Sequence, residues 1–182
     1  MMNRFVIAEP DKCIGCRTCE IACALAHPVG AIAAPLTPAT FAPRLTVVKG
    51  MKISTPVLCR HCEDAPCVNV CPNGAIVYRQ NSVQVLQDRC VGCKTCMVAC
   101  PYGAMNVVAR PAAQPAAGYA TTHAIKAEVQ KCDLCVDHAG GPACIPSCPT
   151  KALHLVDRNT MDAARKSRQE RAALDMTNGR LF

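Results

Sequence analysis

The sequence contains no tryptophan, and all aromatic residues together make up 3% of its 182 residues. The hydrophobic fraction of 51% is inflated by alanine and cysteine, so the bulky side chains of a conventional core are scarce. A fold this poor in large apolar residues needs another kind of cross-link. The lack of stacking aromatics and the scattering of lysine and arginine also argue against a nucleic-acid-binding protein.

Targeting and membrane signals are absent as well. The N-terminal stretch MMNRFVIAEPDKC has neither a long apolar region nor a twin-arginine pair, so no secretory signal is predicted. The most apolar uncharged stretch, residues 21–42, is interrupted by prolines, which predicts no membrane span. We therefore expect a cytoplasmic protein, in which cysteines stay reduced and bind metal in preference to forming disulfides.

Cysteine is the abundant residue, with 16 in the chain, and it occurs in four runs. The runs are Cys13–Cys23, Cys59–Cys71, Cys90–Cys100 and Cys132–Cys148. The first and third have the spacing C-x2-C-x2-C-x3-C. The second has two extra residues before its third cysteine, and the fourth has an eight-residue gap there. Proline follows the last cysteine in three runs, whereas the first run has Ala24.

This spacing is that of the bacterial run that holds a 4Fe–4S cluster and whose fourth cysteine ligates a second cluster. A tight loop can supply three ligands, and the fourth cysteine points into the neighbouring module. We therefore predict four 4Fe–4S clusters, each named here after the run that gives three of its thiols. The run-one set is Cys13, Cys16, Cys19 and Cys148; the run-two set is Cys59, Cys62, Cys67 and Cys100; the run-three set is Cys90, Cys93, Cys96 and Cys71; the run-four set is Cys132, Cys135, Cys144 and Cys23.

Zinc is the main alternative for groups of four cysteines. Zinc ribbons pair two C-x2-C knuckles over a long spacer, whereas these thiols fall in fours with a C-x3-C ending, which favours iron–sulfur clusters. The formal charge of +7 fits this interpretation. Each oxidised cluster with four thiolates contributes about −2, so the basic residues compensate the charge of the bound clusters.

Short alternating segments predict an α+β fold made of two dicluster ferredoxin-like modules. The expected strands are residues 5–9, 45–53, 103–110 and 151–157, a hairpin over 74–86 that turns at Gln80-Asn81, and helical turns over 20–27. Loops are expected over 28–44 and 111–124. The outer module comprises residues 1–50 and 110–157, and the inner module comprises residues 51–109.

Residues 158–182 differ in character, being charged and helical in pattern, with Asn159 or Thr160 as the expected cap. Two interpretations remain open, a solvated helix packed loosely on the domain or a docking tail.

Other polar residues give weaker signals. His61, between two cysteines, is expected to be a hydrogen-bond donor outside the ligand set or to face solvent. Arg17 and Lys94 occupy matching places in runs one and three, where they either compensate cluster charge or are simply solvated. The remaining histidines have no partner spacing and predict no role: His27, His123, His138 and His154. No nucleophile constellation, phosphate loop or G-x-G-x-x-G fingerprint is present, so no catalytic residue is predicted.

Over residues 3–157 the chain resembles the four-cluster ferredoxin-like electron-transfer subunits of molybdenum- or tungsten-pterin oxidoreductases. Within that group it is most similar to the electron-transport proteins associated with formate dehydrogenase H and formate hydrogenlyase, and also to the small subunits of tungsten aldehyde oxidoreductases. The matching stretches are NRFVIAEPDKCIGCRTCEIAC, LTPATFAPRL, CRHCEDAPCVNVCPNGAI, RCVGCKTCMVACPYGAM and KCDLCVDHAGGPACIPSCPTKAL. Ala24 departs from the family's Cys-Pro ending, which puts the local geometry there in question.

The resemblance implies a non-catalytic subunit that passes single electrons between a pterin enzyme and a second redox partner, such as a flavoprotein, a hydrogenase or a ferredoxin. The alternative is an accessory or maturation factor for formate dehydrogenase. Self-association through residues 158–182 is a further expectation.

Overall fold

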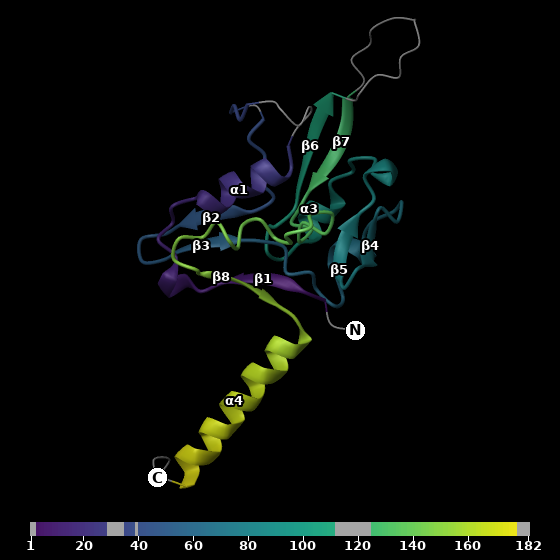
Figure 1. Cartoon of the computed structure of the whole chain (residues 1–182). Coiled ribbons are helices and arrows are strands. Elements are labelled where there is room, and N and C mark those ends of the chain that lie inside the picture. The colour runs from purple at the N-terminus through teal and green to yellow at the C-terminus, as the bar shows by residue number, and fades with distance from the viewer. Residues whose placement is uncertain (1–2, 29–34, 39, 112–124, 178–182) are drawn as a thin grey trace, which may run out of the picture.

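The computed structural model describes residues 3–28, 35–38, 40–111 and 125–177. In these residues the strands form two-stranded antiparallel sheets that surround the cysteine runs (Figure 1). The pairs are β1 (Phe5–Ala8) with β8 (Leu153–Val156), β2 (Thr46–Lys49) with β3 (Ser54–Val57), β4 (Ile76–Arg79) with β5 (Ser82–Val85), and β6 (Asn106–Pro111) with β7 (Ile125–Gln130). The helices are η1 (Pro10–Lys12), α1 (Thr18–Ala26), α2 (Pro66–Asn69), η2 (Gln87–Arg89), α3 (Thr95–Ala99) and α4 (Arg158–Thr177). The predicted α+β class is confirmed.

Most of the predicted elements occur where the sequence placed them, namely β1, α1, the β4–β5 hairpin, β6 and β8. The turn at Gln80 and Asn81 has φ angles of 54° at both residues. Two positive φ values in succession define the tight turn whose twist matches that of the flanking strands. The loop predicted over 111–124 lies outside the described residues, apart from Pro111, which ends β6, and so does part of the loop over 28–44.

Two segments differ from prediction. The single strand expected over 45–53 is instead the start of a hairpin, because the chain turns at Gly50, whose N–H donates to the carbonyl oxygen of Ile53 at 2.8 Å. Strand β7 was not predicted, although its sequence IKAEVQ alternates apolar and polar residues. It pairs with β6 over six residues, and that pairing across a long connection is what stabilises it.

The missing proline at Ala24 has a visible consequence. Helix α1 continues through Cys23 and Ala24 for nine residues, whereas α3 stops at Ala99, directly before Cys100-Pro101. Proline disfavours helical geometry in the residue before it, so a Cys-Pro ending terminates the helix. In the first run the fourth cysteine therefore projects from within a helix.

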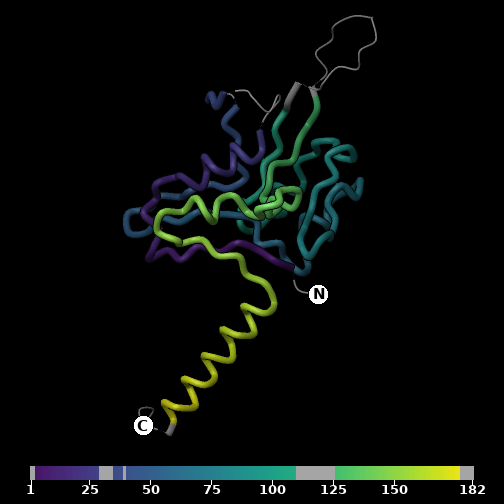
Figure 2. Tube along the Cα trace, in the orientation of Figure 1, coloured from purple at the N-terminus to yellow at the C-terminus, as the bar shows by residue number. Residues whose placement is uncertain are grey.

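The buried apolar residues form two clusters rather than one. The first unites both ends of the chain, with Val6 on β1 and Leu153 on β8, and it contains cysteines of runs one and four. The second contains cysteines of runs two and three, together with Val83 and Val129. Figure 2 shows that the chain after β7 runs back to β8, which pairs with β1.

These clusters place two hairpins differently from the predicted module boundaries. The boundary at 50/51 falls in the β2–β3 turn, although Val47 on β2 and Leu58 after β3 share the first cluster. The boundary at 109/110 falls inside β6, whereas Val129 on β7 belongs to the second cluster. A division that follows the buried residues keeps both hairpins whole.

Helix α4 projects away from the rest of the protein, and its residues from Asn159 to Met176 are exposed (Figure 1). The predicted cap is corrected, because Asp157 and not Asn159 or Thr160 occupies the N-cap. The Asp157 carboxylate accepts the Thr160 N–H at 2.9 Å, and the Thr160 hydroxyl accepts the Asp157 N–H at 2.8 Å. Along the described ranges no helix is both long enough and apolar enough to cross a membrane.

Candidate metal centre

All four runs share one backbone feature. The residue before the second cysteine has a positive φ in each run, with 67° at Gly15, 46° at His61, 72° at Gly92 and 62° at Leu134. This left-handed residue turns the chain sharply, so that successive cysteines of a C-x2-C pair face the same side. The four runs thus repeat one loop geometry, even where the residue is not glycine.

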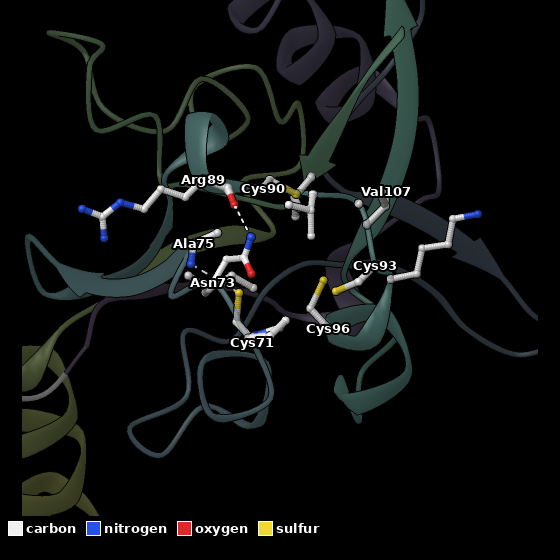
Figure 3. A pocket seen from close by; sticks show the side chains of 14 residues that line it. Cys71, Asn73, Ala75, Arg89, Cys90, Cys93, Cys96 and Val107 are labelled. Carbon is white, nitrogen blue, oxygen red and sulfur yellow. Dashed lines mark hydrogen bonds between the residues drawn. The ribbon is translucent and has the colours of Figure 1, made fainter.

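The thiols of the run-three set line one cavity (Figure 3). Cys90, Cys93 and Cys96 come from the loop and from α3, and Cys71 comes from the end of run two. Their sulfur atoms point toward a common space. The backbone N–H of Ala75 donates to Cys71 Sγ at 3.3 Å. Cys71 of run two thus lines the same cavity as the three cysteines of run three.

A second cavity is lined by the run-one set. Cys13, Cys16 and Cys19 surround it together with Cys148, which arrives from the far end of the chain. The N–H of Ala152 donates to Cys148 Sγ at 3.3 Å. Apolar side chains line both cavities beside the cysteines, among them Ile76 and Val107 in the first and Val47 and Leu153 in the second.

The run-two thiols also lie near one another. Burial, followed by the neighbouring thiol of Cys59, raises the pKa of Cys67 to about 11, and Cys100 and Cys62 contribute in the same direction. Burial and the thiols of Cys59 and Cys100 raise the pKa of Cys62. Thus Cys62 and Cys67 each interact electrostatically with Cys59 and Cys100.

The run-four thiols behave in the same way. Burial raises the pKa of Cys144 above the usual thiol range, and the thiols of Cys132, Cys23 and Cys135 add to the effect. Burial is also the main reason why the pKa of Cys132 rises to about 12. A buried thiol that is surrounded by other thiols cannot ionise to the negatively charged thiolate without a nearby cation.

The donor set fits a 4Fe–4S cluster. Each group offers four sulfur atoms, the more buried thiols need a metal's positive charge to ionise, and N–H and O–H groups donate to the sulfurs. Thr18 donates its hydroxyl to Cys16 Sγ at 3.3 Å, and Thr95 donates to Cys93 Sγ at 3.4 Å. These hydrogen bonds lower the pKa of both thiols. The assignment of individual cysteines to clusters stays a prediction.

Sequence reasoning missed an ion-pair network beside the run-four set. Asp133 pairs with Arg44 and lies 3.1 Å from Nε2 of His27. Burial opposes the charge of His27, but hydrogen bonds with Asp133 and with the thiols of Cys135 and Cys23 raise its pKa to about 12. Asp133 also accepts the N–H of Cys135 at 2.9 Å, so the network fixes the end of α1 against run four.

His61 does not face solvent, because its relative exposure is 1%. Its backbone N–H donates to Cys59 Sγ at 3.4 Å, and its Nδ1 accepts the N–H of Val83 at 3.0 Å. Burial and the charge of Lys131 lower its pKa to about 3, so the ring is neutral and carries its proton on Nε2. The donor in the first contact is the backbone, so the expectation that the His61 side chain donates a hydrogen bond stays a prediction.

The other polar candidates lie at the surface. Arg17 and Lys94 are exposed and both adopt positive φ, at 65° and 64°. Arg17 approaches the carboxylate of Glu20 at 3.9 Å. His154 pairs with Glu9, and His123 lies outside the described residues.

Comparison with known proteins agrees with this geometry. A family model described as a 4Fe-4S dicluster domain matches residues 51–116, and a 4Fe-4S binding domain matches residues 10–26. The chain therefore contains 4Fe–4S-binding domains. Its identity of 55% to an electron transport protein and of 44% to formate hydrogenlyase subunit 2 shows that it belongs to the family of ferredoxin-like electron-transfer subunits.

Three relatives illustrate the range of that family. The electron transport protein HydN of Escherichia coli K12 is 55% identical over 173 residues, covering 95% of this chain and 99% of HydN. Formate hydrogenlyase subunit 2 of the same organism is 44% identical, covering 93% of this chain and 89% of that protein. In Proteus vulgaris, a probable iron-sulfur subunit from the frd operon is 51% identical, covering 78% of this chain and 90% of its own length.

Proposed function

We propose that this protein relays single electrons through four 4Fe–4S clusters, between a molybdenum- or tungsten-pterin oxidoreductase and a second redox partner, in the cytoplasm. It supplies no substrate chemistry of its own. The observation that supports this proposal is the gathering of the cysteines into four groups of four, each drawn from two runs. The relation to HydN and to formate hydrogenlyase supports a partner of the formate dehydrogenase or aldehyde oxidoreductase type.

The groups follow one another in a line. The thiol of Cys144 in the run-four set interacts electrostatically with Cys19 of the run-one set. Cys132 of the run-four set interacts with Cys59 of the run-two set. The run-two and run-three sets share the second apolar cluster. The order is therefore run one, run four, run two, run three.

The two ends of this line reach the surface. Cys16 in the run-one set and Cys93 in the run-three set are exposed cysteines, whereas Cys59, Cys135 and Cys144 in the middle sets are buried. An electron must enter and leave where a partner can approach closely. Two accessible ends suit a protein that serves two partners, one at each end.

The polypeptide contributes position and environment to this relay. When bound, each cluster accepts and releases one electron. The thiolates hold it, and the N–H groups of Ala75 and Ala152 donate to sulfur and favour negative charge there. The division into an outer and an inner module is part of the same proposal, with hairpins assigned by the apolar cluster they join.

The decisive experiment is an anaerobic pull-down of the protein from its native host, with analysis of iron, molybdenum and tungsten. We expect about sixteen irons per chain, because four clusters hold four each, and a stoichiometric pterin enzyme that reduces the clusters when given its substrate. A protein that held its iron but was reduced by no partner enzyme would contradict the relay. Stoichiometric copurification with an active pterin enzyme would exclude a role limited to maturation.

Self-association belongs to the same proposal, because the exposed face of α4 offers a surface for a second copy. Removal of residues 158–182 should then reduce the assembly size measured by light scattering. An unchanged size would eliminate the helix as the contact.

A further inference from the structure

A buried polar path connects the two middle cysteine sets. Cys59 Sγ accepts the N–H of His61, whose ring nitrogen Nδ1 accepts the N–H of Val83 at 3.0 Å. The carbonyl oxygen of Val83 accepts a hydrogen bond from Nζ of Lys131 at 2.5 Å, and Nζ also donates to the carbonyl oxygen of Cys132 at 2.7 Å. The path therefore leads from the run-two set to the run-four set.

Every side chain on this path is inaccessible to water. The relative exposures are 1% for His61, 1% for Val83 and 2% for Lys131. Nε2 of His61, which carries the ring proton, has no hydrogen-bond partner in the part of the chain that the structure describes. A buried donor without a partner is unfavourable, so its retention needs a reason.

The buried ammonium group of Lys131 needs an explanation even more than the Nε2–H of His61 does, because it carries a full charge. Its hydrogen bonds go to two neutral carbonyl oxygens, and within the described ranges it forms no ion pair. The nearby carboxylate of Asp133 is already paired with Arg44 and His27. An uncompensated buried cation is strongly unfavourable, so negative charge must come from elsewhere.

The two adjacent cysteine sets supply that charge once they hold clusters. Each set with its oxidised cluster carries about −2, and one electron makes it more negative. Lys131 faces both sets. Burial and the thiol of Cys59 raise the pKa of Cys67, but the charge of Lys131 lowers it. The same charge acts against burial at Cys132.

The sets at the two ends have no equivalent buried cation among the described residues. Lys12 and Arg89 take the place of Lys131 directly before the first cysteine of runs one and three, and both are exposed. Arg17 and Lys94, within those two runs, are exposed as well. Water and salt screen an exposed charge, so its effect on a nearby cluster is much weaker than that of a buried one. The middle of the line is therefore the more positive environment.

We propose that Lys131 is a fixed buried cation that raises the reduction potentials of the two middle clusters above those of the two end clusters. This inference rests on the proposed relay. An electron that a partner delivers at either end is then held preferentially on the two middle clusters. No bond forms or breaks in this transfer.

The first test replaces the charge and measures potentials. In Lys131→Met and Lys131→Gln proteins with full iron content, EPR-monitored redox titration should show two of the four potentials lowered. We expect at least a tenfold change in each reduction equilibrium, which is about 59 mV for a one-electron couple. The other two potentials should stay within error of the wild-type values.

Two comparisons make this test specific. Lys131→Gln keeps an amide donor and removes the charge, so wild-type potentials in this variant would overturn the proposal in favour of a purely structural hydrogen bond. Lys166→Gln makes the same change of charge on the exposed surface of α4 and should leave all four potentials unchanged. An equal decrease of all four potentials in Lys131→Gln would also overturn it.

A second test needs no variant and therefore does not depend on folding. Histidine nitrogens approach sulfur in both middle sets, with His61 N at 3.4 Å from Cys59 Sγ and His27 Nδ1 at 3.8 Å from Cys23 Sγ. The described residues show no such contact in the end sets. Protein labelled with ¹⁵N-histidine and reduced by one electron should show ¹⁵N hyperfine coupling in pulsed EPR.

The absence of that coupling in the one-electron sample would overturn the inference. The proposed relay would survive this result, because it depends on reduction by a partner enzyme and not on the order of potentials. Conversely, a protein with the expected coupling that no partner reduces would contradict the relay alone.

Discussion

At the third run the chain has no room for even one additional carbon atom. A Cβ placed on Gly92 would lie 2.3 Å from the Cβ of Ala127 on β7, and Gly92 has a φ of +72°. Gly103 has a similar φ of +59° but has no atom within 4 Å of such a Cβ. A substitution at Gly103 therefore introduces backbone strain alone, whereas a substitution at Gly92 introduces both backbone strain and a steric clash.

We predict that Gly92→Ala weakens the run-three site far more than Gly103→Ala. Both changes introduce about 1–2 kcal/mol of left-handed strain. Gly92→Ala adds about 1–3 kcal/mol, because Ala127 belongs to a paired strand and cannot move freely. Anaerobic denaturant unfolding with iron analysis checks this, and equal losses in the two variants would contradict it.

The cysteine groups could be predicted residue by residue, because the chemistry of a cluster fixes the spacing of its ligands. The contacts of the residues around these cysteines could not be predicted. Asp133 meets Arg44 across 89 positions and Lys131 meets Val83 across 48. Such contacts depend on how the runs fold against one another, and no local pattern marks them. His61 was noticed only because it lies between two cysteines.

Helix α4 has no core beneath it, because its residues from Asn159 to Met176 are exposed. An isolated helix gains little from packing, so its ends and its charge pairs decide its stability. Its first turn is held by the reciprocal hydrogen bonds of Asp157 and Thr160, and Arg158 lies 3.8 Å from Asp162. The helix should therefore respond strongly to changes at its cap.

We predict that Asp157→Ala frays the start of α4 while leaving the iron content unchanged. The carboxylate accepts the Thr160 N–H, and alanine cannot replace it. Hydrogen exchange should be several-fold faster in the first turns of α4 and unaltered in β1 and β8. Asp175→Ala, in the last turn, is the matched control, because an acidic residue there opposes the helix dipole and its loss should not weaken the helix.

The strands were predictable to the extent that each one alternates. Strand β7 alternates too, but the sequence before it gave no turn signal that would join it to β6. The β2–β3 hairpin was mistaken for one strand because its turn, at Gly50, lies within a run of alternating residues. In both cases the pairing with a partner strand, and not the alternation within the strand, determines where a strand forms and where it ends.

For the molecule as a whole, the two apolar clusters contain different cysteines. The loss of one iron–sulfur cluster should therefore destabilise only the strands of its own half. We predict that Cys148→Ala removes about four irons and loosens β1 and β8, because Cys148 lines the run-one cavity. Cys71→Ala should remove a similar amount of iron but loosen β4–β5 and β6–β7, because Cys71 lines the run-three cavity. Iron analysis and hydrogen exchange on each holoprotein distinguish the two.

Loss of all clusters in either variant, with general loss of protection, would contradict this separation. It would indicate that the two halves fold as one unit through the junction around Lys131 and His61.

The pairing of β1 with β8 also has a consequence for how the protein is made. During synthesis, β1 has no hydrogen-bond partner until residues 153–156 of β8 have been made. Cys13 likewise cannot share a cavity with Cys148 until that residue has been made. Runs two and three, in contrast, are adjacent in the chain and can meet earlier. Cluster insertion should therefore proceed from the inside outward, with the run-one site incomplete until residues 148–156 have been made.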